Sequence, residues 1–275
     1  MTSSRVALVT GGSSGIGEET ARRLRAADFD VYAVARRVDR MAALEKDGVR
    51  VFGMDVTDEE SMTSGVERIV EETGRIDLLV NNAGYGSYGA VEDVPIDEAR
   101  RQFEVNLFGL ARLTQLVTPV MRRNGGGRII NISSIGAVIY EPFGAWYHAT
   151  KFAVEGFSDS LRVELAPFGI DVVIVRPAGI VTEWNTIARD SLRDTSRGGP
   201  YEQMADSAVR RLASVDNKLL SSGPRAVART IVKAATASRP RTRYASGRGA
   251  RLVPAVRRLL PDRAFDAVLR RAYLS

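Results

Sequence analysis

Short apolar runs rich in β-branched residues alternate with longer amphipathic stretches over the first 180 residues of this chain. We expect strands over residues 6–10, 31–35, 49–55, 78–80, 128–132 and 171–175. Helices are expected over 15–27, from 58, from 96, over 107–121 and over 145–165. Strands that are apolar throughout are buried on both faces. The alternation therefore predicts a single α/β domain built on a doubly wound parallel sheet.

This alternation of apolar runs and amphipathic stretches stops near residue 182. Residues 182–223 are polar and contain glycine and proline, which predicts a lid inserted in the domain, and a helix is expected over 224–238. Residues 239–275 form a basic helical extension, with ten arginines against Asp262 and Asp266, in a chain of net charge +6. We favour a solvated helical face for these arginines, with a membrane surface or an acidic partner as the alternatives.

Cysteine is absent and His148 is the only histidine, so we expect no disulfide and no metal site. No apolar run approaches the ~20 residues of a membrane span, and no signal-peptide pattern precedes the first strand. A cytoplasmic location is therefore expected. Nucleic-acid binding would rest on the basic extension alone and is not expected.

A glycine-rich turn, Thr10-Gly-Gly-Ser-Ser-Gly-Ile-Gly17, lies between the first expected strand and the first helix. A dinucleotide pyrophosphate needs close backbone approach and the free N–H groups of a helix N-terminus, which this position supplies. An ordinary glycine turn is the alternative. The turn predicts a dinucleotide site that includes Gly11, Ser13, Ser14, Gly15, Ile16 and Gly17.

The end of the second expected strand indicates which dinucleotide binds. NAD enzymes usually place an acidic residue there against the ribose 2′-hydroxyl, whereas this chain has Ala35 followed by Arg36 and Arg37. Guanidinium groups bind a 2′-phosphate bidentately. We therefore predict NADP(H) as the cofactor, with a simple surface-loop role for the two arginines as the alternative.

Tyr147 and Lys151 are one turn apart on the same face of an expected helix. A neighbouring ammonium stabilises a phenolate, so we expect it to lower the pKa of Tyr147 and make the hydroxyl a usable acid or base. Ser134 follows the strand over 128–132, where its hydroxyl can hold a carbonyl oxygen. The three residues predict acid–base chemistry by a tyrosine at a carbonyl oxygen.

From Val6 to about Thr182 the chain resembles the short-chain dehydrogenase/reductase family, in the branch with a Tyr-x-x-x-Lys pair. Its extension resembles those of retinol and hydroxysteroid dehydrogenases. The matching motifs, in order, are Thr10–Gly17, Asp55-Val56, Asn81-Asn-Ala-Gly84, Asn106, Ser133-Ser134, Tyr147 with Lys151, and Arg176-Pro177 through Thr182.

The resemblance implies roles for these residues. Tyr147 would donate the proton in reduction, Lys151 would tune it and bind the nicotinamide ribose, and Ser134 would polarise the carbonyl. Asn106 would hold a water that links Lys151 to solvent. Further cofactor contacts are implied for Asp55 and Val56 beside the adenine, for Asn81, Ala83 and Gly84 in the cleft, and for Pro177, Gly179 and Thr182 near the carboxamide.

Some of these positions keep a second interpretation. Asn81 and Asn82 equally fit a structural turn that braces the sheet, and Asn106 fits a polar residue that bends a helix. His148 lies off the Tyr147 face of the helix and is expected to be structural. The family's usual Pro-Gly is here Pro177-Ala178-Gly179, so the loop after this strand is expected to differ in shape.

Five aromatic residues are expected either to line the substrate pocket or to pack in the core or lid: Tyr85, Tyr140, Phe143, Trp146 and Trp184. They favour an apolar substrate of steroid, retinoid or long-chain type. The rival functions are a non-catalytic NAD(P)-binding regulator and an epimerase or dehydratase on the same fold. The resemblance also implies a homodimer or homotetramer.

Overall fold

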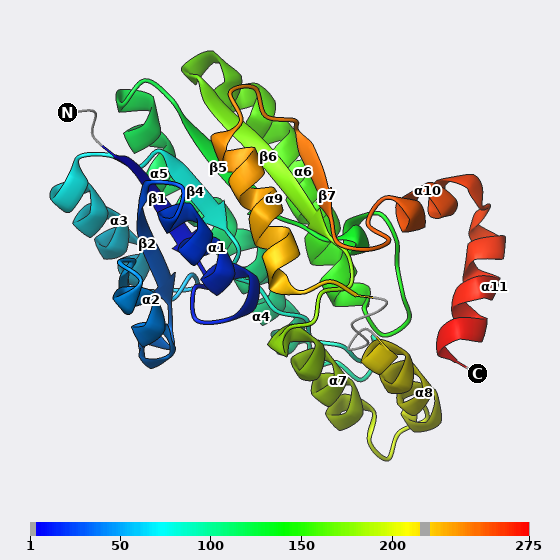
Figure 1. Cartoon of the computed structure of the whole chain (residues 1–275). Helices are drawn as coiled ribbons and strands as arrows, with labels where there is room; N and C mark the ends of the chain where they lie inside the picture. The colour runs from blue at the N-terminus through cyan, green and yellow to red at the C-terminus, as the bar shows by residue number, and fades with distance from the viewer. Residues whose placement is uncertain (1–3, 215–220, 275) are drawn as a thin grey trace.

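The computed structural model of the protein describes residues 4–214 and 221–274, and within them seven strands form one parallel sheet. The strand order is β3-β2-β1-β4-β5-β6-β7 (Figure 1). This arrangement confirms the predicted doubly wound sheet. The strands are β1 Arg5–Thr10, β2 Phe29–Ala35, β3 Arg50–Gly53, β4 Leu78–Asn81, β5 Gly127–Ile132, β6 Ile170–Pro177 and β7 Arg243–Ser246.

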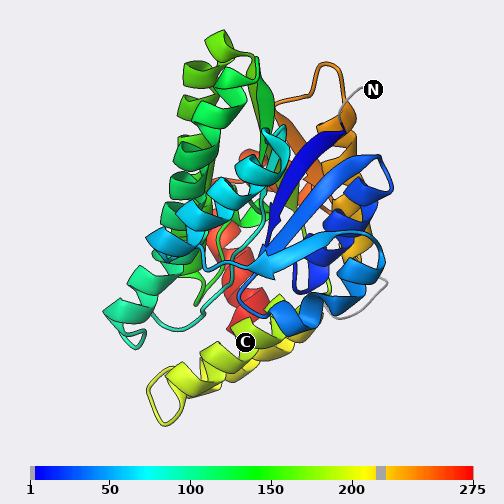
Figure 2. The same ribbon diagram turned by 90° about the vertical axis from the view of Figure 1, so that its left-hand side faces the viewer.

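Alternate residues of each strand serve different cores. In β1, Ala7 and Val9 pack with one cluster, whereas Val6 and Leu8 pack with the other. The first core is covered by α1 and α9, and the second by α3, α5 and α6 (Figures 1 and 2). Burial on both faces explains why the strands are apolar throughout.

The longer helices are α1 Gly15–Arg25, α2 Ala42–Lys46, α3 Glu59–Thr73, α4 Ile96–Phe103, α5 Gly109–Arg123, α6 Ala145–Leu165, α7 Glu183–Ser196, α8 Glu202–Ala213, α9 Pro224–Thr236, α10 Leu252–Leu259 and α11 Asp262–Tyr273. Short helical turns are η1 Val38–Met41, η2 Glu104–Phe108, η3 Ile135–Ala137 and η4 Ala166–Phe168. The N-terminus of α3 is at the expected place, since the Asp58 side chain accepts a hydrogen bond from the Ser61 N–H at 2.8 Å.

The C-terminal part differs from the expectation in one respect. Residues 239–275 are not entirely a helical extension, because Arg243–Ser246 pair with β6 as the seventh strand. This strand is only four residues long and carries arginine and tyrosine on an edge, so it lacks the apolar run that identified the others. Helices α10 and α11 follow it and extend beyond the β7 edge (Figure 1).

The predicted lid, residues 182–223, contains the helices α7 and α8 below the carboxyl edge of the sheet in Figure 1. Residues 215–220 of this prediction lie outside the described residues. None of the helices in residues 4–214 and 221–274 is long and apolar enough to cross a membrane. Strand order reverses between β1 and β4, and ligands of such sheets bind at the carboxyl ends of the strands beside that point.

Candidate active site

The glycine-rich turn after β1 uses left-handed backbone conformations that favour glycine. Gly11 has φ +70° and Gly15 has φ +57°. A methyl group at Gly17 would lie 2.1 Å from the Gly11 carbonyl oxygen, so α1 begins directly against the turn. Ser14 precedes α1 in extended conformation, and its side chain makes no capping bond. The turn thus leaves a helix N-terminus open to a phosphate, and these residues fit a dinucleotide.

Thr10 and Asn82 join the carboxyl ends of β1 and β4. Thr10 Oγ1 accepts hydrogen bonds from the N–H groups of Asn82 and Ala83 at 3.0 and 2.9 Å. The Asn82 amide donates to the Thr10 carbonyl oxygen at 3.0 Å. A methyl group at Gly11 would lie 2.8 Å from this amide nitrogen. Asn82 therefore braces the sheet, as one of its two interpretations stated.

Asn81 points into the sheet. Its buried amide donates to Asn131 Oδ1 at 2.9 Å and to Thr114 Oγ1 at 3.2 Å, and Asn131 in turn donates to Ser158 Oγ. This chain of buried polar groups ties β4 and β5 to α5 and α6. The side chain of Asn81 thus serves the sheet, and a cofactor contact from this residue would have to come from its backbone.

The residues predicted to bind the adenosine part of the cofactor lie near the surface. Arg36 is 64% exposed, and its guanidinium lies 4.0 Å from Asp55 Oδ2. The other oxygen of Asp55 accepts from the N–H and hydroxyl of Thr57. Val56 packs against the second core beside these residues. Arg37 is turned toward the lid, where it pairs with Glu183 at 3.4 Å.

Ser134 and Tyr147 meet at the carboxyl edge of β5. Ser134 Oγ accepts from the Gly136 N–H at 3.0 Å, and the Ser134 side chain is close enough to the Tyr147 phenol to affect its pKa. Burial raises the pKa of Tyr147 to about 12, while the interaction with Ser134 acts in the opposite direction. The expectation that Lys151 lowers the pKa of Tyr147 is therefore wrong here, because desolvation dominates.

Lys151 lies one turn after Tyr147 in α6. Its ammonium donates to the Ile132 carbonyl oxygen at 3.0 Å, and Nζ is 5.9 Å from the centroid of the Tyr147 ring. The side chain is buried, and desolvation lowers the pKa of Lys151 to about 8, although Glu155 acts in the opposite direction. Lys151 can thus lose a proton close to neutral pH.

Asn106 lies in the π-helical turn η2, between α4 and α5, a geometry that often marks functional sites. Its amide donates to the Tyr85 carbonyl oxygen at 2.9 Å and to Thr150 Oγ1 at 3.1 Å, while Oδ1 accepts from the Tyr85 N–H. A methyl group at Gly84 would lie 3.0 Å from that oxygen and 3.8 Å from Lys151 Nζ. The structure thus brings Asn106, Gly84 and Lys151 together.

The loop after β6 returns to the glycine-rich turn. Ala178 donates its N–H to Ser246 of β7, and the Gly179 carbonyl accepts from Ser222 at 3.1 Å. Thr182 begins α7 next to Gly15, where a methyl group would lie 3.3 Å from Thr182 Cγ2. The extra Ala178 therefore pairs the loop to β7, and Thr182 reaches the phosphate turn.

Aromatic rings surround Tyr147. The Trp184 ring lies 4.9 Å from that of Tyr147, centroid to centroid, and Tyr88 lies 6.0 Å from it. Phe143 belongs to the same cluster and packs edge-on against Tyr201 of the lid at 6.2 Å. Trp184 and Phe143 thus pack in this cluster, as the core or lid interpretation expected, and their role as pocket walls stays a prediction. Tyr88 was missed because no motif marks it.

The other aromatic residues predicted to line the pocket make different contacts. The Tyr140 hydroxyl donates to Asp266 at 2.7 Å, and its ring packs edge-on against Phe265 at 5.2 Å, so Tyr140 anchors α11. The Tyr85 hydroxyl donates to Glu98 of α4 at 2.9 Å. Trp146 is half-buried, and its indole nitrogen has no hydrogen-bond partner among the described residues.

The C-terminal helix α11 contacts the aromatic cluster around Tyr147 through Tyr273. Tyr273 packs against it and donates its hydroxyl to Glu141, and the Arg211 guanidinium of α8 lies 5.9 Å from the Tyr273 ring. The buried His148 accepts from the Glu141 N–H at Nε2, which places the proton on Nδ1 for the Gly136 carbonyl oxygen at 2.7 Å. His148 is thus occupied on both sides by backbone.

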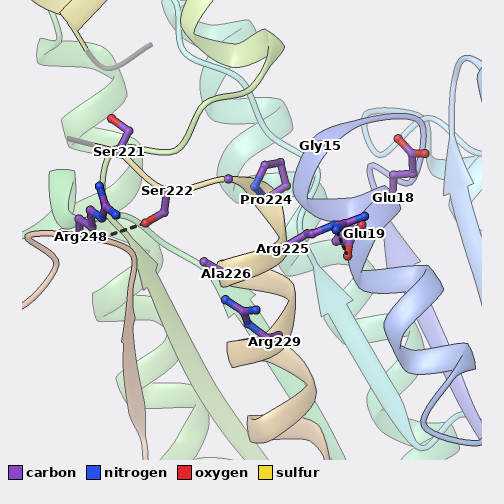
Figure 3. Close-up of a pocket in the computed structure, with 11 residues that line it drawn as sticks. Gly15, Glu18, Glu19, Ser221, Ser222, Pro224, Arg225, Ala226, Arg229 and Arg248 are labelled. Carbon is purple, nitrogen blue, oxygen red and sulfur yellow. Dashed lines mark hydrogen bonds and ion pairs between the residues drawn. The ribbon is translucent and has the colours of Figure 1, made fainter. Parts of the chain in front are cut away.

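A cavity of about 680 Å³ opens beside the glycine-rich turn, at the start of α1 and α9 (Figure 3). Arg225 and Glu19 approach each other there at 3.6 Å, and Ser222 accepts from the Arg248 N–H. Neither Tyr147 nor Trp184 is among the residues that line it. Its lining is Gly15, Glu18, Glu19, Ser221, Ser222, Gly223, Pro224, Arg225, Ala226, Arg229 and Arg248.

Comparison with known proteins gives the relatives of this chain. A family model described as short chain dehydrogenase matches residues 5–192. The chain is 38% identical over 214 residues to the 3-ketodihydrosphingosine reductase of Bacteroides thetaiotaomicron, across 78% of this chain and 77% of that protein. It is 33% identical to the NADPH-dependent 3-dehydrocapnine reductase of Ornithobacterium rhinotracheale, across 96% and 95%.

Among solved structures, the crystal structure of a short-chain dehydrogenase from Streptomyces avermitilis superposes with a TM-score of 0.79 at 32% identity, over 98% of this chain and 96% of that one. The likeness therefore includes α10 and α11 as well as the sheet.

Proposed function

Because this chain belongs to the short-chain dehydrogenase/reductase family, we propose that it uses NADP(H) to interconvert a ketone and a secondary alcohol. The family relationship makes it an oxidoreductase that binds a nicotinamide cofactor. The observation that carries the proposal is that Ser134, Tyr147 and the buried Lys151 converge at the carboxyl edge of β5, with Lys151 Nζ 5.9 Å from the centroid of the Tyr147 ring. A protein that only binds the cofactor has no use for that serine.

When bound, the nicotinamide supplies or accepts the hydride. In reduction, Ser134 holds the substrate carbonyl oxygen and Tyr147 gives its phenolic proton to that oxygen. Since the pKa of Tyr147 is raised to about 12 by burial, the hydroxyl is protonated at neutral pH and can act as the acid in reduction. Lys151 stabilises the phenolate that remains and supplies the replacement proton, for which a pKa lowered to about 8 is well matched.

Asn106 acts in this scheme as a positioning residue. It holds the Tyr85 backbone and Thr150, and Thr150 Oγ1 donates to the Tyr147 carbonyl oxygen at 2.7 Å. Both N–H groups of the Asn106 side-chain amide already bond to protein atoms. The water bridge from Lys151 to solvent therefore stays a proposal.

We assign the preference for NADP(H) to the arginines after β2. Arg36 is exposed beside Asp55, and Arg37 lies next in the chain, with no carboxylate following β2 at either position. A titration of the purified protein tests this assignment. NADPH should bind more tightly than NADH, and Arg36→Ala with Arg37→Ala should remove about tenfold or more of that preference. Tighter binding of NADH would contradict it.

For the substrate we propose an apolar, long-chain 3-oxo compound. The cluster of Tyr88, Phe143 and Trp184 beside Tyr147 is apolar, and two relatives are named as reductases of 3-ketodihydrosphingosine and 3-dehydrocapnine. A screen of NADPH oxidation across 3-ketodihydrosphingosine, long-chain ketones, ketosteroids, retinal and acyl carrier substrates tests this. Activity confined to short polar ketones would contradict the apolar pocket.

We further propose that α10 touches a lipid surface from which such substrates are taken. Leu252, Val256 and Leu259 share one face of α10 and are 67%, 43% and 82% exposed, with Arg251 and Arg258 exposed beside them. Deleting the tail would disturb the Tyr273 contact, so point variants are the better test. Wild-type protein should co-sediment with anionic vesicles, and Leu252→Asp with Leu259→Asp should abolish this binding. If wild type and the double variant both bind negligibly, the proposal is contradicted.

A homo-oligomer is proposed from a second exposed face. Phe152 and Val163 lie three turns apart on the same side of α6 and are 50% and 71% exposed. Light scattering after gel filtration should show a dimer or tetramer, and Phe152→Glu with Val163→Glu should shift it toward monomer. A wild-type monomer at micromolar concentration would contradict this proposal.

A further inference from the structure

The first residues of the lid helix α7 touch three separate parts of the active site. Thr182 lies against Gly15 of the phosphate turn, Glu183 pairs with arginines that follow β2, and Trp184 lies on the Tyr147 ring. Three consecutive residues thus connect the two ends of the cofactor site with the proton donor. A shift of one of them displaces the others.

Glu183 holds two arginines. Its carboxylate accepts from Arg40 at 2.9 and 3.1 Å and from Arg37 at 3.4 Å. These three side chains are about half exposed, so a ligand can reach them. A carboxylate between two guanidinium groups occupies the kind of position that a phosphate takes, and a phosphate carries more charge and more acceptor oxygens.

Trp184 covers Tyr147. Tyr147 is only 8% exposed, with the indole 4.9 Å from its ring and edge-on to Tyr88 at 5.8 Å. A methyl group at Gly86 would lie 2.3 Å from Trp184 Cζ2, so the indole sits directly on that backbone. A large ketone that approaches Tyr147 has to share this space with the indole.

The middle of α7 is held by different contacts. Ser191 Oγ accepts from the Tyr88 N–H at 3.1 Å and donates to the Tyr88 carbonyl oxygen at 3.0 Å, and it also bonds to Ser87. Leu192 is fully buried in the lid cluster. Next to Trp184, the buried Asn185 amide donates to the Ile180 carbonyl oxygen at 3.1 Å. The movement that loss of the Glu183 ion pairs permits is therefore one of the first two residues of α7, Glu183 and Trp184, and not of the whole helix.

We propose that Glu183 is a placeholder for the cofactor's 2′-phosphate, which takes Arg37 and Arg40 from it, frees the start of α7 and moves Trp184 off Tyr147. The device rests on the proposed preference for NADP(H). A cofactor without the 2′-phosphate leaves the ion pairs in place and Tyr147 covered, so discrimination acts on the substrate side as well as on binding.

The test uses fragments that lack the nicotinamide. Trp146→Phe leaves Trp184 as the only tryptophan of the chain, so acrylamide quenching reports its exposure. Adenosine 2′,5′-bisphosphate should increase the quenching, whereas 5′-AMP should not. Glu183→Gln should show high quenching without ligand and bind the bisphosphate about 3–10-fold more tightly, as the loss of two exposed ion pairs allows.

The matched control is Asp190→Asn, which removes another exposed α7 carboxylate whose partner is Arg193 at 3.9 Å; it should behave as the parent. Hydrogen exchange of α7 in wild-type protein repeats the readout without a tryptophan substitution. If the bisphosphate binds more tightly than AMP but neither quenching nor exchange changes, the placeholder role is overturned and the NADP(H) preference stands. If it binds no more tightly than AMP, the NADP(H) preference itself is overturned.

Discussion

The two halves of the active site are built in different ways. The cofactor half is fixed by backbone: Gly17 allows α1 to start against the Gly11 carbonyl, and Asn82 ties that turn to β4. The substrate half is fixed by side chains that pack around Tyr147, from α7, α8 and the end of α11. Backbone constraints leave few alternatives at each position, whereas aromatic packing tolerates many, so the first half suits a shared cofactor and the second a particular substrate.

Tyr147 belongs to both halves, and changing it should produce the largest effect. Tyr147→Phe keeps the ring that Trp184 and Tyr88 contact but removes the proton donor. We expect kcat to fall by about 10²–10⁴-fold, while the Kd for NADPH stays nearly unchanged. Steady-state kinetics with a fluorescence titration check this. Retained turnover would show that another group donates the proton.

The cofactor half can be tested by adding a single methyl group. Gly17→Ala places it 2.1 Å from a backbone oxygen, which cannot rotate away, so we expect about 1–3 kcal/mol lower stability and weaker NADPH binding. Gly53→Ala in β3 is the control, because the nearest atom to a methyl group there is Val38 Cγ2 at an ordinary contact distance of 3.4 Å. It should be neutral or gain about 0.5–1 kcal/mol. Equal unfolding midpoints for the two variants would contradict a backbone-determined turn.

Buried Lys151 predicts a pH effect on stability. Its pKa is about 8 in the folded protein and 10.5 as an ordinary lysine, so the unfolded chain binds more protons between those values. Stability should therefore rise with pH across that window. Wild type should gain about 2–3 kcal/mol relative to Lys151→Met between pH 8 and 10.5, at about 1.4 kcal/mol per unit. Denaturant unfolding of both proteins measures the difference, and a constant difference would contradict the buried ammonium.

The smallest effect is expected at the edge of the substrate half. Phe265 is the buried residue of α11 and packs on Tyr140, with the Arg257 guanidinium 5.1 Å from its ring. Phe265→Ala should free the C-terminal helices with little change in global melting temperature, which limited trypsin digestion would show as faster cleavage near Arg258. Val268→Ala on the same helix is 55% exposed and should cleave like wild type.

The same contrast explains what the sequence could predict. Gly11, Gly17, Tyr147 and Lys151 each have a narrow chemical reason to be where they are, so their motifs predicted site residues, while the alternation of apolar and amphipathic stretches predicted the sheet. The packing of Tyr140 against α11 follows from three-dimensional contacts between residues more than one hundred positions apart, which no local pattern reveals.

Other features were missed for equally physical reasons. Strand β7 carries Arg243 and Tyr244 on a sheet edge and lacks an apolar run, so periodicity did not identify it. The pKa of Tyr147 was predicted in the wrong direction because spacing along a helix shows that Lys151 is near but says nothing about burial. In the sequence nothing distinguishes Glu183 from the other acidic residues. Its ion pairs with Arg37 and Arg40 become visible only in the structure.

The most direct test of the proposed chemistry is a single turnover with NADPH that carries deuterium at both C4 positions of the nicotinamide, and 3-ketodihydrosphingosine or another long-chain ketone. We expect one deuterium on the new carbinol carbon with wild-type protein, and the same label at least about 10²-fold more slowly with Tyr147→Phe. NADPH that binds tightly but transfers no deuterium to any ketone of the panel would contradict the oxidoreductase and favour a protein that only senses the cofactor.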